Sequence, residues 1–119
     1  MRLQISEDHT HLLRDGKHFF WLADTCWSAF TNISDAEWIE YLDIRAGQGF
    51  NVLQINALPQ WDRYGTLQGW QPFSLIDGMR YDFSVIQPDY FRHAQEMCQA
   101  AVDRGFTLAL VVMWCNYVP

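Results

Sequence analysis

The sequence predicts an α/β protein, the N-terminal portion of a (β/α)8 TIM barrel preceded by a small β-hairpin. Three apolar runs, about 19–24, 50–56 and 106–113, each end on polar or aromatic residues. Stretches with helical periodicity separate the runs, as in successive units of a parallel α/β barrel. A barrel of this kind usually needs ~250 residues. We therefore interpret residues 1–119 as the first part of one catalytic barrel, incomplete at the C-terminus.

The start of the chain has the pattern of short β-strands. Residues 2–14 alternate apolar and polar side chains around a short acidic turn, which predicts a hairpin. Asp15-Gly16 forms a turn that leads into the first barrel strand, Phe19–Ala23. This run is nearly all apolar, as expected for a strand that is covered on both faces.

Two helices connect the predicted barrel strands. Ser34-Asp35-Ala36-Glu37 has the spacing of a capping box, which predicts a helix up to about Gln48. Pro88 suits the first turn of a second helix, which carries a regular apolar stripe. Each helix is followed by the same junction before the next strand, Gly49-Phe50 and Gly105-Phe106. The repetition supports successive βα units.

The connection after the second strand is unusually long. Residues 57–87 are rich in Gly, Pro, Asp and aromatic residues, and no period lasts through them. Loops of this length in a compact domain are functional or disordered. Because disordered segments are poor in aromatic residues, the composition favours a shaped binding loop.

Composition and charge exclude several classes of protein. The chain is 50% hydrophobic with six Trp, and its net charge is −6. Nucleic acids and anionic membranes call for clustered Lys and Arg, so neither is expected as a partner. No apolar stretch reaches the ~18 residues of a spanning helix. The N-terminus turns acidic where a signal peptide would turn apolar, which favours a cytoplasmic location.

Asp24 is the strongest candidate for a site residue. It directly follows the first predicted strand, so its carboxylate is expected at the mouth of the sheet. There it could hold a substrate hydroxyl, orient a catalytic group or bind a cation. Alternatively, it is a structural residue that caps a turn through Thr25. Trp27 could line the same pocket, or it could close the barrel bottom or contact a helix.

Aromatic and amide side chains near the other strand ends indicate a carbohydrate substrate. A sugar ring packs its C–H face on an aromatic plane, and its hydroxyls need hydrogen-bonding partners beside it. The same aromatic residues could instead stabilise loops, and packing is the favoured role for Trp70. The predicted substrate-binding residues are Asp24, Trp27, Asn56, Trp61, Trp114 and Asn116.

Other chemistry has little support in the sequence. His9 and His11 alternate on one face, but no third ligand has the spacing of a metal site. Cys26 has no partner His at a recognisable spacing, so a thiol nucleophile is not expected. Three Cys without a C-x-x-C pair indicate reduced thiols. No metal and no cofactor are therefore predicted.

Four segments together resemble a known family. Asp15-Gly16-Lys17 leads to the run from Phe19 to Trp27, and the segments Gly49–Gln54 and Gly105–Val111 follow, the last with Trp114 behind it. In this order and spacing the chain resembles the N-terminal part of the apiosidase-like glycoside hydrolases, a family often labelled endoglucanase. The resemblance covers most of residues 10–116.

The resemblance implies a (β/α)8 barrel that hydrolyses O-glycosidic bonds in plant-type carbohydrates. Its catalytic carboxylates follow later strands, around the fourth and seventh, and are therefore expected outside this chain. Asp24 and Trp27 would line the pocket around the scissile bond. The chain of 119 residues alone is then expected to be inactive.

Two alternatives stay open from the sequence. The first is a non-catalytic carbohydrate-binding or interaction module that is complete at 119 residues. The second is a small doubly wound domain of flavodoxin type, which would need a phosphate loop after its first strand. Asp24-Thr25-Cys26-Trp27 is a poor loop for that purpose. The oligomeric state is not indicated.

Overall fold

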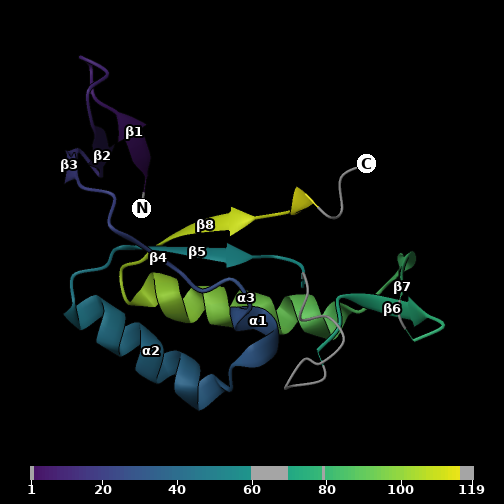
Figure 1. Cartoon of the computed structure of the whole chain (residues 1–119). Coiled ribbons are helices and arrows are strands. Elements are labelled where there is room, and N and C mark those ends of the chain that lie inside the picture. Colours follow the sequence, from purple (N-terminus) through teal and green to yellow (C-terminus); the bar gives the residue numbers. More distant parts are fainter. Residues whose placement is uncertain (1, 60–69, 79, 116–119) are drawn as a thin grey trace.

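The structure is built around a short parallel sheet that carries its helices on one face. The computed structural model describes residues 2–59, 70–78 and 80–115. Figure 1 labels the elements, which in chain order are β1 (Leu3–Ile5), β2 (Leu12–Arg14), β3 (Lys17–Phe19), β4 (Ala23–Thr25), α1 (Ala29–Asn32), α2 (Asp35–Gly47), β5 (Val52–Asn56), β6 (Phe73–Ile76), β7 (Arg80–Ile86), α3 (Pro88–Asp103) and β8 (Thr107–Val111).

The parallel sheet has the strand order β4-β5-β8. Val52 of β5 pairs with Ala23 of β4 on one side and with Thr107 of β8 on the other. Helices α1 and α2 connect β4 to β5, and α3 lies before β8. Figure 1 shows these helices on one face of the sheet and an open opposite face. The α/β class predicted from the sequence is confirmed. A closed barrel needs eight strands, and the described residues contribute three to this sheet.

The hydrophobic core lies between β5 and the two longer helices. Leu53 and Ile55 are fully buried and pack in one cluster with Trp38 of α2 and Met97 of α3. The indole Nε1 of Trp38 donates a hydrogen bond to the Met97 carbonyl oxygen at 3.0 Å. A buried polar atom therefore has its partner, and this bond joins α2 to α3. Within the described part of the chain, no helix has the length and apolar character needed to cross a bilayer.

The repeated glycine-phenylalanine junction is the same helix ending used twice. Gly49 and Gly105 both have a φ of +87°, the left-handed conformation that glycine adopts without strain. The N–H groups of Gly49 and Phe50 donate to Ala46 and Arg45. The corresponding bonds after α3 run from Gly105 to Val102 and from Phe106 to Ala101. Both sets match a Schellman motif, so each helix turns directly into the next strand.

The predicted capping box is present at the start of α2. Ser34 Oγ accepts a hydrogen bond from the Glu37 N–H at 3.4 Å, and a Glu37 carboxylate oxygen accepts from the Ser34 N–H at 2.9 Å. The two bonds satisfy backbone donors that a helix start leaves open. The helix begins where the sequence predicts and ends at Gly47.

The N-terminal segment forms a third strand that the sequence prediction did not include. β1, β2 and β3 make an antiparallel sheet in this order, and the turn between β2 and β3 has positive φ at Asp15 and Gly16. Arg14 connects this sheet to the rest of the molecule, because its Nη1 donates to the Gly105 carbonyl oxygen at 2.8 Å. Its guanidinium also lies over the ring of Phe19, with 4.6 Å to the centroid.

The predicted position of the first barrel strand is wrong. Phe19 belongs to β3, where it pairs with Leu12, and the parallel strand β4 begins only at Ala23. Between these strands Phe20 and Trp21 are 70% and 43% exposed. The Asn51 side chain bonds the backbone of Phe20 and of Leu22, so this segment runs past the start of β5 as a connection. A continuous apolar run does not reveal such a change of sheet.

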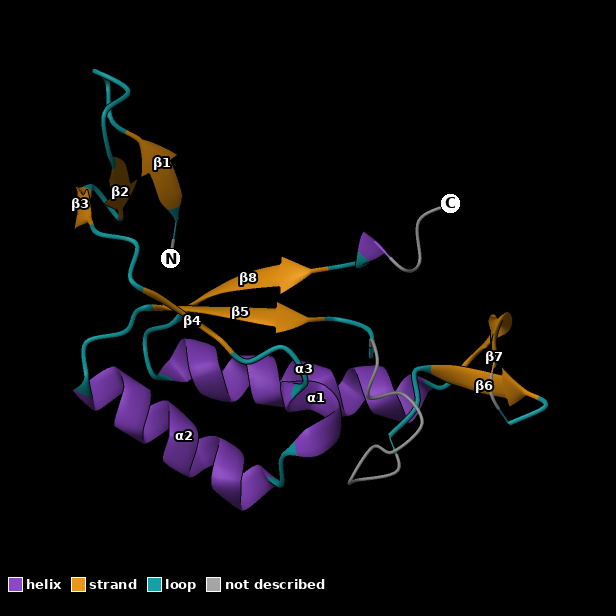
Figure 2. Cartoon of the chain, in the orientation of Figure 1, coloured by secondary structure: helices purple, strands orange, loops and turns teal. Residues whose placement is uncertain are grey.

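The long connection after β5 contains regular structure. β6 and β7 form an antiparallel hairpin with a register shift between Phe73 and Ser74. Figure 2 shows this hairpin beyond the carboxyl ends of β5 and β8. No strands were predicted in this connection from the sequence, although Tyr81, Phe83 and Val85 alternate with polar residues along β7. The binding role of residues 57–87 stays a prediction. Residues 60–69 lie outside the described residues.

We expect Leu53→Ala to lower the free energy of unfolding by about 3 kcal/mol, because it leaves a cavity in a fully buried site. Leu53 is 0% exposed. The matched control is Leu110→Ala on the neighbouring strand, where the side chain is 46% exposed and the loss should be about 1 kcal/mol. Urea unfolding followed by circular dichroism measures both. Equal losses would contradict the burial of Leu53 in the core.

Candidate functional site

The two faces of the parallel sheet have different surroundings. Leu53 and Ile55 of β5 point to the helices, where they join the core cluster. Because side chains alternate along a strand, Gln54 and Asn56 belong to the opposite face, which α1, α2 and α3 leave open (Figure 1). The register aligns Asp24 of β4 with Leu53. The alignment therefore puts Asp24 on the helix side.

Contacts of the Asp24 carboxylate agree with this placement. The Tyr41 hydroxyl donates a hydrogen bond to Oδ2 at 2.8 Å, and Arg45 Nε lies 2.5 Å from the same oxygen. Arg45 Nε makes no hydrogen bond of normal geometry, so this second contact is an ion pair. The Thr25 N–H donates to Oδ1 at 2.9 Å. These contacts join β4 to α2 and favour the structural alternative for Asp24.

The surroundings of Asp24 also change the acidity of its neighbours. Burial raises the pKa of the Tyr41 phenol, and the hydrogen bond to Asp24 raises it further. Burial raises the pKa of the Cys26 thiol to about 11, and the Asp24 charge acts in the same direction. The thiol points to the Gln54 carbonyl oxygen at 3.7 Å. A protonated thiol is a poor nucleophile, so no nucleophilic role is assigned to Cys26. The contacts of Asp24 and Cys26 instead hold β4 in place.

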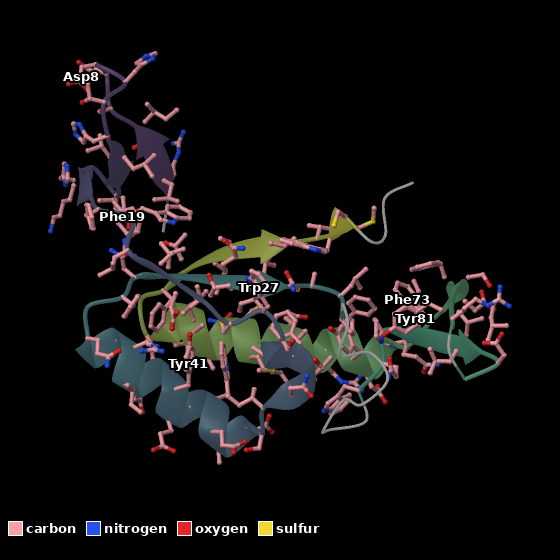
Figure 3. The ribbon with its side chains drawn as sticks, viewed as in Figure 1. Asp8, Phe19, Trp27, Tyr41, Phe73 and Tyr81 are labelled. Carbon is pink, nitrogen blue, oxygen red and sulfur yellow. The ribbon has the colours of Figure 1, made fainter. Side chains whose placement is uncertain are left out.

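A second group of residues meets at the carboxyl edge of the sheet. Trp27 follows β4, Asn56 ends β5 and Trp114 follows β8. The rings of Trp27 and Trp114 have centroids 5.5 Å apart and planes inclined by 43°. The Asn56 N–H donates to the Trp27 carbonyl oxygen at 3.3 Å, and Figure 3 shows Trp27 beside β5. The structure therefore brings together three of the predicted residues from three strands.

Asn56 has an unusual environment within this group. The residue is only 5% exposed, and its side-chain Oδ1 has no hydrogen-bond partner among the described residues. A buried acceptor without a partner costs about 1–3 kcal/mol. Such groups in native proteins are uncommon and call for an explanation. A ligand hydroxyl or a further part of the protein would supply the missing donor.

Trp61 and Asn116 lie outside the described residues. Trp70 packs with its ring 4.6 Å from His93 and nearly parallel to it. Among the residues that the structure describes, no group of three or more His, Cys, Asp or Glu side chains could hold a metal ion.

Sequence reasoning missed Tyr41 and Arg45, the partners of Asp24. The two residues are four positions apart on α2, so they lie on one face of the helix. An aromatic donor and a cation at this spacing, beside a strand that carries an acid, are the signal that could have indicated the contact.

A comparison with protein families identifies the family of the chain. A family model described as the catalytic domain of apiosidase-like proteins matches residues 6–119. The chain belongs to the apiosidase-like family. The resemblance seen in the sequence is thereby confirmed. No curated protein matches the chain.

Solved structures show a similar fold in larger proteins. One structure, titled a glycoside hydrolase, has a TM-score of 0.68 and 22% identity to the apiosidase-like chain, of which it covers 98%. A family 5 glycoside hydrolase from Bacteroides vulgatus has a TM-score of 0.73 and 24% identity, also over 98% of the chain. The chain spans only 26% and 25% of these two proteins. At these identities the likeness concerns the fold.

We expect Asp24→Asn to lower the free energy of unfolding by about 1–2 kcal/mol, because the substitution weakens a charge-assisted contact with Tyr41 and Arg45. The matched control is Asp43→Asn, which weakens an exposed ion pair with Arg104 and should cost less than about 0.5 kcal/mol. Thermal and urea unfolding compare the two. A larger loss in the control would contradict the role given to Asp24.

Alkylation by iodoacetamide tests the environment of Cys26 in a variant that carries Cys98→Ser and Cys115→Ser. Because burial raises the pKa of this thiol to about 11, the reaction should be slow at pH 8 and accelerate up to about pH 11. In denaturant the same thiol should titrate near its ordinary pKa of about 8.5. Identical pH profiles in the native and denatured chain would contradict the burial.

Proposed function

We propose that the chain forms the first part of a glycoside hydrolase barrel that acts on O-glycosidic bonds of plant-type carbohydrates. The observation that carries the proposal is the group of Trp27, Trp114 and Asn56 at the carboxyl edge of the sheet. Active sites of α/β barrels lie at this edge. Membership in the apiosidase-like catalytic family supports the same conclusion.

The chemistry of this edge suits a sugar. Two inclined indole rings offer apolar planes for the C–H face of a pyranose or furanose ring. The Asn56 amide carries two donors and an acceptor, and the acceptor has no partner among the described residues. A hydroxyl group on the ring would satisfy it. Trp61 and Asn116 remain proposed substrate-binding residues on the grounds given by the sequence.

Asp24 supports the proposed site through the backbone of β4. Its carboxylate is held by Tyr41 and Arg45 on the helix side, and Trp27 follows three residues later on the same chain segment. The contact between β4 and α2 thereby limits the positions that the Trp27 ring can take. We assign Asp24 a positioning role in substrate binding.

Bond cleavage needs a pair of carboxyl groups across the scissile bond. A separation of about 5 Å gives retention of configuration, and roughly 6.5–9.5 Å leaves room for water and gives inversion. The Asp24 carboxylate accepts a hydrogen bond from Tyr41 of α2 and lies on the helix side of the sheet. We therefore do not assign it to this catalytic pair. We propose that both carboxylates come from strands outside this chain, because the similar glycoside hydrolases are about four times as long.

A kinetic comparison with aryl glycosides tests the proposed site in the full-length protein. Asn56→Ala should lower kcat/KM about 10- to 100-fold, because it removes a hydrogen bond in a buried site. Gln95→Ala on the exposed part of α3 is the control and should leave kcat/KM unchanged. An Asn56→Ala protein with full activity and wild-type stability would contradict the proposal.

The same experiment separates an enzyme from a binding module. Oligosaccharide binding without release of reducing sugar by the full-length protein would favour the non-catalytic alternative. Hydrolysis that depends on Asn56 would exclude it. The isolated chain of 119 residues should bind sugar weakly and release none.

A further inference from the structure

We propose that the groove between the β6–β7 hairpin and the start of α3 binds an additional uncharged sugar unit of the same substrate chain. This inference rests on the proposed function, because it extends the binding edge beyond Trp27 and Asn56. The groove has a volume of about 470 Å³, within the range of small-molecule sites. Its lining includes Trp70, Gln71, Phe73, Ser74, Gln87 and Asp89.

The groove is fixed to the carboxyl edge of the sheet. Tyr90 of α3 is 2% exposed and donates a hydrogen bond to the Ala57 carbonyl oxygen at 2.9 Å. Ala57 is the residue after Asn56. The Gln87 N–H donates to the Pro72 carbonyl oxygen at 2.9 Å and ties the hairpin to the helix start. Figure 1 shows the hairpin at the end of the sheet to which β5 and β8 point. A carbohydrate chain that leaves the edge on this side would reach the groove.

Aromatic rings in the groove are held in place by their neighbours. His93 stacks on Trp70, with centroids 4.6 Å apart and planes inclined by only 9°. The His93 ring is itself fixed, because its Nε2 lies 2.8 Å from an Asp35 carboxylate oxygen. Phe73 contacts Phe83 edge to face at 4.9 Å. Fixed aromatic rings lose little conformational freedom on binding, and they favour stacking of a sugar ring.

Polar groups lie beside these rings. Gln87 Nε2 donates to Ser74 Oγ at 2.7 Å, and the Ser74 hydroxyl can in turn donate its hydrogen to a ligand. The side-chain Oε1 of Gln87 can accept a hydrogen bond from a sugar hydroxyl. Gln71 adds a further amide, whose Oε1 accepts from the Tyr81 hydroxyl at 2.7 Å. Amides and hydroxyls next to aromatic planes match the mixed surface of a neutral sugar.

The charge of the groove favours uncharged sugars over acidic ones. Asp89 lines the groove and is 72% exposed in its ion pair with Arg92. Arg92 already pairs with this carboxylate, and the described lining residues include no Lys, Arg or His that could bind the carboxylate of a uronic acid. The net charge of −6 acts in the same direction.

The test uses side-chain amide signals in nitrogen-15 NMR spectra, assigned with Gln71→Ala, Gln87→Ala and Asn56→Ala variants. The probes are neutral xylo-, cello- and galacto-oligosaccharides of two to five units, with oligogalacturonides as the acidic arm. We expect the Gln87 signal to shift with tetrasaccharides, the affinity to rise at least about fivefold from the disaccharide, and acidic oligosaccharides to bind more weakly.

Gln87→Ala is the informative variant because the Gln87 side chain makes no cap hydrogen bond to α3. The substitution should abolish the gain in affinity with oligosaccharide length. The control Gln95→Ala on α3 should retain this gain. Shifts of the Trp27 indole and Asn56 signals without a shift of Gln87 would overturn the groove and leave the proposed function standing. Shifts confined to Gln87 and Gln71 would support the groove and contradict the sugar site at Asn56. No shift at millimolar oligosaccharide would overturn both.

Discussion

The parallel pairing of β5 with β4 and β8 is the constraint on which the other features depend. β5 is the central strand. Its aliphatic side chains Leu53 and Ile55 are fully buried under α2 and α3. Because alternate residues point to opposite faces, burying this pair assigns Gln54 and Asn56 to the open face. The neighbouring strands follow the same register. One buried strand thus decides which side chains face the helices and which point to the opposite face.

β4 has separate roles on its two sides. Asp24 is bound to Tyr41 and Arg45 on the helix side, and the segment continues to Trp27 at the carboxyl edge. A short strand of three residues has few backbone hydrogen bonds of its own. The polar contacts with α2 therefore fix a strand that would otherwise be held weakly. The contacts of Asp24 thus favour a structural role, and the proposed sugar contacts come from aromatic and amide groups.

The sequence was sufficient where a local signal determines the structure. The Ser34–Glu37 capping box and the two glycine junctions depend on residues close in the chain, and they appear as predicted. The first barrel strand was misplaced because Phe19 and Ala23 belong to different sheets, and hydrophobicity does not distinguish one sheet from another. The side of the sheet that Asp24 occupies depends on its register with Leu53, which involves residues far apart in the chain. The β6–β7 hairpin was missed although Tyr81, Phe83 and Val85 alternate with polar residues in β7, because this local alternation does not extend through the long connection.

The hydrogen bond from Arg14 to the Gly105 carbonyl oxygen links two segments separated by 91 positions in the chain. It attaches the β1–β3 sheet near the amino end of β8, opposite to the edge that carries Trp27 and Trp114. An affinity tag or fluorophore placed before Leu3 would thus be remote from the proposed sugar site at Trp27 and Trp114. Attachment to a sensor surface through the segment before Leu3 should accordingly leave this site accessible.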